Sequence, residues 1–313
     1  MIDYIENQTC LFINQMPKAL RKKYGQFFTS KETAAFMAGL FDIPAEKPSV
    51  SILDPGAGSG MLSVALLQTL ETHPNLRHVD LVCYENDENV LPLLKSNLDW
   101  ACRHTRLDVS FQIVDDNYIL SQVLEYNEML GANSVPPKYD FVIGNPPYMK
   151  VSKDAPEAKA MPDVCYGAPN LYFLFASMSL FNLKDQGELV YIIPRSWTSG
   201  AYFKQFRQKL LREGALEHIH LFVSRDKVFE KESVLQETII IKLRKTLTPP
   251  KTIHLSTTQN NQDFSKITSF DAPYHMIVSG EDNYVFLITN QEEAEVLERI
   301  SKWKDTLPSL GMR

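Results

Sequence analysis

The sequence predicts an α/β fold in which helices cover a doubly wound, mostly parallel sheet of seven strands. Seven apolar runs of strand length recur along the chain, and stretches with helical spacing of apolar residues separate several of them. A glycine-rich turn directly follows the first apolar run and precedes a helical stretch. A strand, a helix and a second strand in this order normally form a right-handed parallel unit.

Several of the expected strands are apolar almost throughout, which is typical of central strands that are covered on both faces. The expected strands are Val50–Leu53, Val79–Tyr84, Val109–Ile113, Tyr139–Ile143, Glu188–Ile193, Leu216–Leu221 and Thr238–Leu243. The expected helices between them are Met61–Leu70, Asn89–Trp100, Leu171–Leu183 and Tyr202–Arg212.

Two parts of the chain lack this pattern. Met149–Pro169 is rich in Lys, Asp, Ala, Pro and Gly, and we expect a long mobile loop there, because loops of this length are usually lids or binding loops. After Lys245 the sequence becomes polar and turn-rich, which predicts a linker or an excursion before a strand at Tyr284–Ile288 and a helix at Gln291–Lys302. We therefore expect one domain over residues 1–245 and an extension over residues 246–313.

The charge of the chain argues mildly against one class of function. A formal net charge of −6 and a sequence pI of about 5.7 do not suit a protein that coats nucleic acid through bulk charge. Positive charge is nevertheless clustered in three short stretches, and each is either a solvated face or a phosphate contact. The stretches contain Lys18, Arg21, Lys22 and Lys23, then Lys204, Arg207, Lys209 and Arg212, and last Lys242, Arg244 and Lys245.

The cysteines and the N-terminus indicate a cytoplasmic protein. The four cysteines form no CxxC pair and have no His cluster beside them, so we expect reduced thiols and no zinc site. The N-terminus lacks the basic-then-apolar pattern of a signal peptide. No apolar run reaches membrane-spanning length, and we expect no membrane partner.

The glycine-rich turn after the first expected strand is the first candidate binding element. It reads Asp54-Pro55-Gly56-Ala57-Gly58-Ser59-Gly60. Glycines in a strand-to-helix turn let a ligand approach the backbone, although many such turns bind nothing. A carboxylate at Asp54 suits a ligand ammonium through a charge-assisted hydrogen bond.

Acceptor groups also follow the second and third expected strands. Glu85, with Asn86 beside it, stands where an acidic side chain accepts both hydroxyls of a ribose; the alternative is a plain surface acid. Next come Asp116 and Asn117, where an acceptor suits the exocyclic amine of an adenine and Tyr118 flanks its ring; the alternative is an Asx turn. Ammonium, ribose and adenine together describe S-adenosylmethionine.

The fourth expected strand ends at Asn145-Pro146-Pro147-Tyr148, which is either a simple turn or a catalytic element. The lone pair of an exocyclic adenine amine is delocalised into the ring, so the amine is a poor nucleophile. Two acceptors on its hydrogens, the Asn145 side-chain oxygen and the Pro146 carbonyl, draw the nitrogen towards a nucleophilic shape. The prolines fix these dipoles before the reaction. Tyr148 offers a face on which a flipped base stacks.

With these motifs the chain resembles the N6-adenine-specific DNA methyltransferases of bacterial restriction–modification systems, in their gamma arrangement. The resemblance covers roughly positions 20–245. In the family an Asp usually precedes the aromatic residue after the third strand, whereas Asn117 precedes Tyr118 here, so the partner of the donor adenine is either Asp116 or Asn117. The matching pieces are Gly25–Thr29, Asp54–Gly60, Glu85, the Asp116 region, Asn145–Tyr148, Gly187–Trp197 and Val228–Leu243.

The resemblance implies a Rossmann-like methyltransferase domain over residues 1–245. It further implies direct, metal-free transfer of a methyl group from S-adenosylmethionine to N6 of an adenine flipped out of duplex DNA. Phe28 and Thr29 then help to bind the methionine end of the donor, and Phe229 covers the other face of the flipped base. A cognate restriction endonuclease or a separate specificity region is the further partner that the resemblance implies.

Other interpretations of the same motifs stay open. An enzyme of this fold methylates an RNA base or a protein glutamine amide in some cases, and a non-catalytic DNA-binding module retains the fold without the reaction. Gly25–Thr29 and Ile193–Trp197 favour DNA, and the intact tetrapeptide argues against a non-catalytic module. The short intervals between motifs leave no space for a recognition domain, so we expect it beyond residue 313 or on another subunit.

Overall fold

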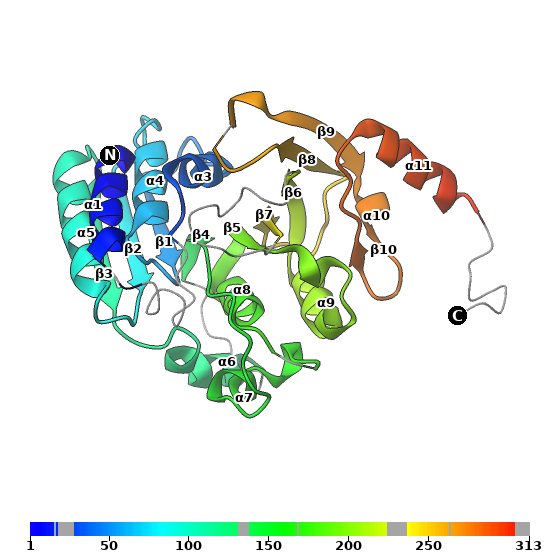
Figure 1. Ribbon diagram of the computed structural model, residues 1–313, viewed down its shortest axis with the longest axis horizontal. Helices are drawn as coiled ribbons and strands as arrows, with labels where there is room; N and C mark the ends of the chain where they lie inside the picture. The colour runs from blue at the N-terminus through cyan, green and yellow to red at the C-terminus, as the bar shows by residue number, and fades with distance from the viewer. Residues whose placement is uncertain are drawn as a thin grey trace.

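The computed structural model describes residues 1–15, 17, 28–130, 138–167, 169–223, 237–262 and 264–303. Its main feature is a nine-stranded sheet in the order β3-β2-β1-β4-β5-β7-β6-β8-β9 (Figure 1). All seven predicted strands are confirmed within it. They are β1 (Ser49–Asp54), β2 (His78–Tyr84), β3 (Asp108–Val114), β4 (Tyr139–Gly144), β5 (Leu183–Pro194), β6 (Ala215–Phe222) and β7 (Thr238–Arg244).

The sheet is mostly parallel, as predicted. Strands β1 to β5 pair in parallel, whereas β7 lies antiparallel between β5 and β6. The carboxyl ends of β1, β2, β3 and β4 therefore meet at one edge of the sheet, which is where ligands bind in open α/β sheets.

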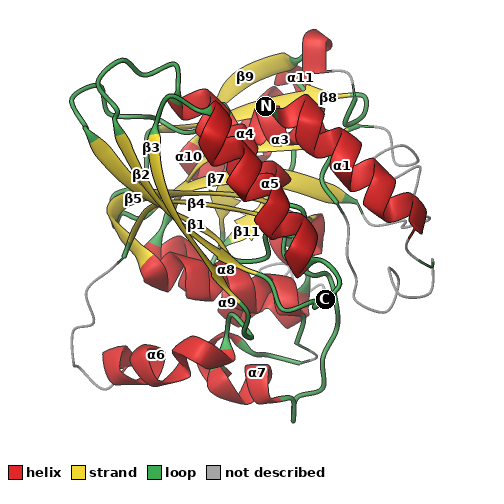
Figure 2. Ribbon diagram, turned by 90° about the vertical axis from the view of Figure 1, so that its left-hand side faces the viewer, coloured by secondary structure: helices red, strands yellow, loops and turns green. Residues whose placement is uncertain are grey.

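Helices cover both faces of the sheet (Figures 1 and 2). Successive strand residues alternate between two buried clusters, since Ile52 packs with helices α1, α3, α4 and α5 while Leu53 packs with α8 and α9. No helix in the described part of the chain is long and apolar enough to span a bilayer. The bounds are α1 (Ile2–Gln15), α3 (Lys31–Ala38), α4 (Met61–Leu70), α5 (Leu91–His104), α6 (Val123–Leu130), α8 (Leu171–Asn182) and α9 (Lys204–Glu213).

The predicted linker or excursion after Lys245 is wrong, because the sheet continues through this segment. Strand β8 (Thr252–Thr258) pairs in parallel with β6, and β9 (Thr268–Pro273) pairs with β8. Strand β8 is largely buried although its sequence is polar, because its hydroxyls bond to the imidazoles of the half-buried His218 and the buried His220. Ser256 Oγ lies 2.6 Å from His218 Nε2 and 2.8 Å from His220 Nδ1.

The remaining C-terminal elements are small. The predicted strand at Tyr284–Ile288 is only the two-residue β11 (Tyr284–Val285), which pairs with β10 (Val278–Ser279). The predicted helix is confirmed as α11 (Gln291–Ser301), and α10 (Tyr274–Ile277) precedes β10.

The segment from Met149 to Pro169 has more structure than the predicted loop. It contains helix α7 (Pro156–Ala160) and a 3₁₀ turn at Pro162–Val164. Its two ends are joined, because Val151 N donates to Pro169 O at 2.9 Å. Its middle is anchored at Asp163, which accepts a hydrogen bond from Tyr126 Oη at 2.8 Å. We call residues 149–170 the α7 excursion.

Several cations of two of the three basic clusters have structural roles rather than phosphate contacts. Arg207 is fully buried and donates to the carbonyls of Trp197 and Gly200. Lys209 is buried beside Asp163, at 2.9 Å. Lys245 donates to the carbonyls that end α8. The cluster from Lys18 to Lys23 lies outside the described residues.

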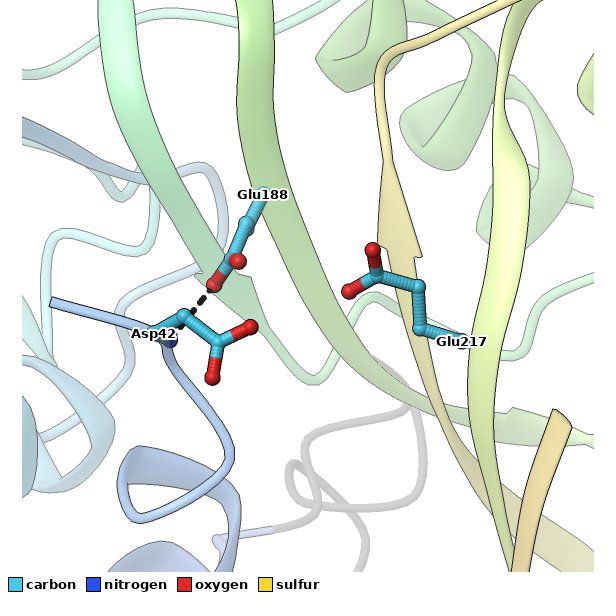
Figure 3. Close-up of side chains that lie close together, drawn as sticks. All are labelled: Asp42, Glu188 and Glu217. Atoms are coloured by element: carbon cyan, nitrogen blue, oxygen red, sulfur yellow. Dashed lines mark hydrogen bonds between the residues drawn. The ribbon is translucent and has the colours of Figure 1, made fainter. Parts of the chain in front are cut away.

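Three carboxylates gather on the sheet away from the carboxyl ends of β1 to β4. One oxygen each of Asp42, Glu188 and Glu217 lies within 4.8 Å of the others (Figure 3). Two cations from β7 lie among them, because Lys242 and Arg244 each pair with all three carboxylates. The cluster is therefore an ion-pair network that joins the segment after α3 to β5, β6 and β7.

We predict that Lys242→Met lowers the free energy of unfolding by about 3 kcal/mol, because breaking a buried pair leaves an uncompensated charge. The Lys242 side chain is 6% exposed and lies 3.2 Å from Glu188. Urea denaturation measures the loss. The matched control is Lys302→Met, whose ammonium pairs with Glu298 on the surface and whose loss we expect to stay below about 1 kcal/mol. Equal losses in the two variants would contradict the assignment.

Candidate active site

A cavity of about 310 Å³ lies at the carboxyl ends of β1 to β4. It runs from the glycine-rich turn to the tetrapeptide, so it brings together most of the predicted site residues. Of these, Phe28, Pro55, Gly56, Gly58, Glu85, Asn86, Asp116, Asn117, Tyr118, Asn145 and Pro147 line it. Thr29, Asp54, Ala57, Gly60, Pro146 and Tyr148 are not among its lining residues, and Phe229 lies outside the described residues.

Six lining residues were missed by the sequence interpretation: Tyr84, Asp87, Met149, Glu157, Leu171 and Phe175. Met149 and Glu157 belong to the α7 excursion, and Leu171 and Phe175 belong to α8. Four lining residues are acidic (Glu85, Asp87, Asp116 and Glu157), and none of the described lining residues is Lys or Arg. The cavity therefore favours a ligand that carries positive charge.

The glycine-rich turn needs glycine at two positions. Gly58 and Gly60 have φ values of 53° and 82°, a left-handed conformation that costs other residues energy. A Cβ on Gly60 would also lie 3.0 Å from Leu94 Cδ1. The turn thus leads from β1 into α4 without side chains that would obstruct the cavity.

Glu85 holds this turn to the end of β2. Its Oε2 accepts a hydrogen bond from Gly58 N at 3.0 Å, and its Oε1 accepts from the backbone N–H groups of Asn86 and Asp87, both at 2.9 Å. Burial raises the pKa of the carboxyl, although the three N–H donors oppose the shift. No cation neutralises Glu85 among the described residues.

Asp54 lies beneath the turn rather than in the cavity. Its side chain is fully buried and accepts a hydrogen bond from Ser63 Oγ at 2.7 Å. Burial raises the pKa of Asp54 to about 7. Because the carboxylate is not among the cavity-lining groups, the predicted direct bond to a ligand ammonium has no support in this geometry. Its contact with Ser63 instead fixes the start of α4.

The two candidates after β3 differ in what their side chains already bind. Asn117 Oδ1 accepts from Ile119 N and Leu120 N at 3.0 and 3.1 Å, and its Nδ2 donates to Glu157 Oε1 at 2.8 Å. Asp116 is exposed, and in the described chain only its Oδ1 accepts a hydrogen bond, from Asn117 N at 2.6 Å. The available acceptor is therefore on Asp116.

Aromatic rings form the apolar side of the cavity. Tyr118 is buried, and its ring centroid lies 4.9 Å from that of Tyr84 and 5.1 Å from that of Phe175. Its hydroxyl lies 3.1 Å from Ser179 Oγ, so the polar end of the ring is satisfied inside the core. A flat apolar ligand fits against such a surface.

The tetrapeptide presents an oriented amide. Asn145 Nδ2 donates to Thr29 Oγ1 at 3.1 Å, and Asn145 Oδ1 accepts from Tyr148 Oη at 2.6 Å. A hydroxyl group thus holds each end of the amide. The Tyr148 hydroxyl also lies 2.9 Å from Ile192 O, and the residue is only 8% exposed. Thr29 and Tyr148 therefore position Asn145, a role that the sequence did not indicate.

Comparisons with known proteins agree on one family. The model of the Eco57I restriction-modification methylase family matches residues 74–229. The type II methyltransferase M.PstI of Providencia stuartii is 33% identical over 303 residues, which are 95% of this chain and 58% of that protein. The type II methyltransferase M.BsuBI of Bacillus subtilis is 34% identical over 88% of this chain and 54% of its own length. The chain thus spans little more than half the length of these relatives.

Solved structures share the fold. A class I S-adenosylmethionine-dependent methyltransferase from Listeria monocytogenes aligns with a TM-score of 0.58 and 20% identity, over 77% of this chain and 68% of that one. The type IIG restriction endonuclease BpuSI aligns with a TM-score of 0.57 and 18% identity, over 79% of this chain and 31% of that one. The fold is that of S-adenosylmethionine-dependent methyltransferases.

We predict that Asp54→Asn alters how stability depends on pH. The pKa of Asp54 is about 7 in the folded chain against an ordinary value of 3.8, so the native state holds a proton that the unfolded chain has lost. The wild-type free energy of unfolding therefore falls, through this group, as the pH rises from about 4 to about 7. The variant lacks this component and gains stability relative to wild type over that window. Urea denaturation at a series of pH values tests this, and parallel profiles would contradict it.

Proposed function

Because the chain belongs to the restriction–modification DNA methyltransferases, we propose that it transfers a methyl group from S-adenosylmethionine to N6 of an adenine flipped out of duplex DNA. One observation carries the proposal: the oriented Asn145 amide lines the same cavity as Glu85 and Asp116. Asn145, which acts on the acceptor amine, thus lines the same cavity as the side chains that suit the nucleoside part of the donor.

The cavity fits S-adenosylmethionine in size and chemistry. About 310 Å³ is within the range of small-molecule sites. Glu85 suits the ribose hydroxyls and Asp116 suits the exocyclic amine of the donor adenine, while Tyr118 and Phe175 suit its ring. When bound, the donor supplies an electrophilic methyl group on a sulfonium.

The residues of the chain act on the acceptor. The Asn145 side-chain oxygen and the Pro146 carbonyl accept hydrogen bonds from the target amine, so that its lone pair becomes available to attack the methyl carbon. Asn145 is held by Thr29 and Tyr148 before the acceptor arrives. Such preorganised dipoles lower the barrier, since they need no reorientation during the reaction.

We predict that Asn145→Ala lowers the rate of methyl transfer to duplex DNA about 100-fold or more, as does the loss of a preorganised acceptor elsewhere. The affinity for S-adenosylmethionine should change little, because Asn145 acts on the target amine. Tritium-labelled methyl transfer and calorimetry measure the two quantities.

Thr29→Val and Thr29→Ser form the matched pair for the positioning role. The valine removes the acceptor of Asn145 Nδ2, and we expect a kcat about tenfold lower. Donor affinity should change little, because Thr29 does not line the cavity; a loss of affinity would instead support the role at the methionine end of the donor that the resemblance implies. The serine retains the hydroxyl and should restore kcat. The acceptor class is tested in the same assay, because methyl groups found on RNA or on a glutamine amide, and not on DNA, would refute the proposed substrate.

We also predict that Asp116, rather than Asn117, recognises the donor adenine. Asp116→Ala should weaken S-adenosylhomocysteine binding about tenfold, the loss of one hydrogen bond to a charged group. The variant should lose the preference for this ligand over its deaminated inosine analogue, which lacks the exocyclic amine. Asn117→Ala should retain that preference. A preference that survives in Asp116→Ala would assign the adenine to another group.

A further inference from the structure

A second cavity lies on the other side of helix α7 from the candidate active site. Its volume is about 550 Å³, and Lys153, Lys159, Tyr166 and Tyr202 are among its lining residues. We call it the α7 groove. Adjacent residues of α7 divide the two cavities, because Glu157 lines the donor cavity while Ala158 and Lys159 line the groove. The groove therefore begins one residue away from the site in which the methyl donor is proposed to bind.

The groove is lined by two exposed lysines that are not part of the buried ion pairs of the fold. Lys153 is exposed and forms no ion pair within the described residues. Lys159 pairs there only with Asp154, at 3.5 Å, and both side chains are largely exposed. By contrast, Lys209 and Lys242 are buried in ion pairs. On a chain with a net charge of −6, these two ammonium groups attract an anionic partner locally.

Two exposed aromatic rings accompany the lysines. Tyr166 is 55% exposed and Tyr202 is 64% exposed. Tyr202 lies directly over Gly167, where a Cβ would be only 2.2 Å from the tyrosine Cδ1. Gly167 has a φ of 83°, so glycine suits both the backbone and the ring. Lysines beside exposed rings are the combination with which proteins hold the backbone and bases of nucleic acids.

We propose that the α7 groove binds the sugar–phosphate backbone of the duplex next to the flipped adenine. Lys153 and Lys159 contact phosphates, and the Tyr166 ring packs on the adjoining nucleotide. This inference rests on the proposed function, because it takes DNA as the substrate. The α7 excursion starts directly after the tetrapeptide, and its Met149 and Glu157 line the same cavity as Asn145, so one segment contributes to both surfaces.

Titration of labelled duplex DNA at several salt concentrations tests the proposal on the full chain. Each lost phosphate contact lowers the slope of log affinity against log salt by about 0.9, so the variant Lys153→Gln/Lys159→Gln should have a slope about 1.8 shallower. Tyr166→Ala should weaken binding at every salt concentration without a change of slope. The affinity for S-adenosylmethionine should be unchanged in both variants.

The control is Lys95→Gln/Lys302→Gln, which alters net charge equally at exposed lysines of α5 and of the residue after α11. It should retain the wild-type slope. If the groove and control variants gave the same slope, the groove would not be a DNA contact. If the proposed function were wrong, the wild-type chain would transfer no methyl group to DNA. The salt titration would still show whether DNA binds in the groove.

Discussion

The candidate active site depends on one half-buried carboxylate, that of Glu85. Three backbone N–H groups bind it, one from the glycine-rich turn after β1 and two from the residues after β2. Backbone donors stabilise the charge without a cation, so the carboxylate keeps its negative field at the cavity. The same bonds fix the turn against the neighbouring strand. The shape of the cavity and its electrostatics therefore have a common origin.

The donor and acceptor ends of the site are linked by side chains from distant parts of the sequence. Asn117 bonds to Glu157 of the α7 excursion, and Asn145 bonds to Thr29, which precedes α3. Each link joins a strand end to a segment that is not part of the sheet. The excursion lines the donor cavity on one side of α7 and the groove on the other. A displacement of α7 would thus alter both surfaces together.

The sequence predicted the sheet and the strand-end residues because both follow from local patterns. Apolar runs identify buried strands, and parallel strands bring their carboxyl ends to one edge. The sequence interpretation was incomplete where contacts between residues distant in the sequence determine the structure. Strand β8 looked polar because its hydroxyls bond to the imidazoles of His218 and His220, and the sequence did not show that Asp54 bonds to Ser63 of α4. Arg207 looked like a surface cation, but carbonyls of a nearby turn bury it. Glu157 bonds to Asn117, which is 40 residues away in the sequence, so no local pattern indicated this contact.

The acidic residues that line the candidate active site have a consequence for the exchange of product for substrate. If the proposed donor binds there, Glu85, Asp87, Asp116 and Glu157 attract its sulfonium, and no described lysine or arginine lines the cavity to oppose them. In the proposed reaction, methyl transfer converts the sulfonium into a neutral thioether, so this part of the electrostatic attraction is lost when the methyl group leaves. The negative potential of the cavity therefore attracts S-adenosylmethionine more strongly than S-adenosylhomocysteine, which favours exchange of the product for a new donor. In this arrangement the wall of the cavity distinguishes substrate from product by charge, without any contact to the methyl group itself.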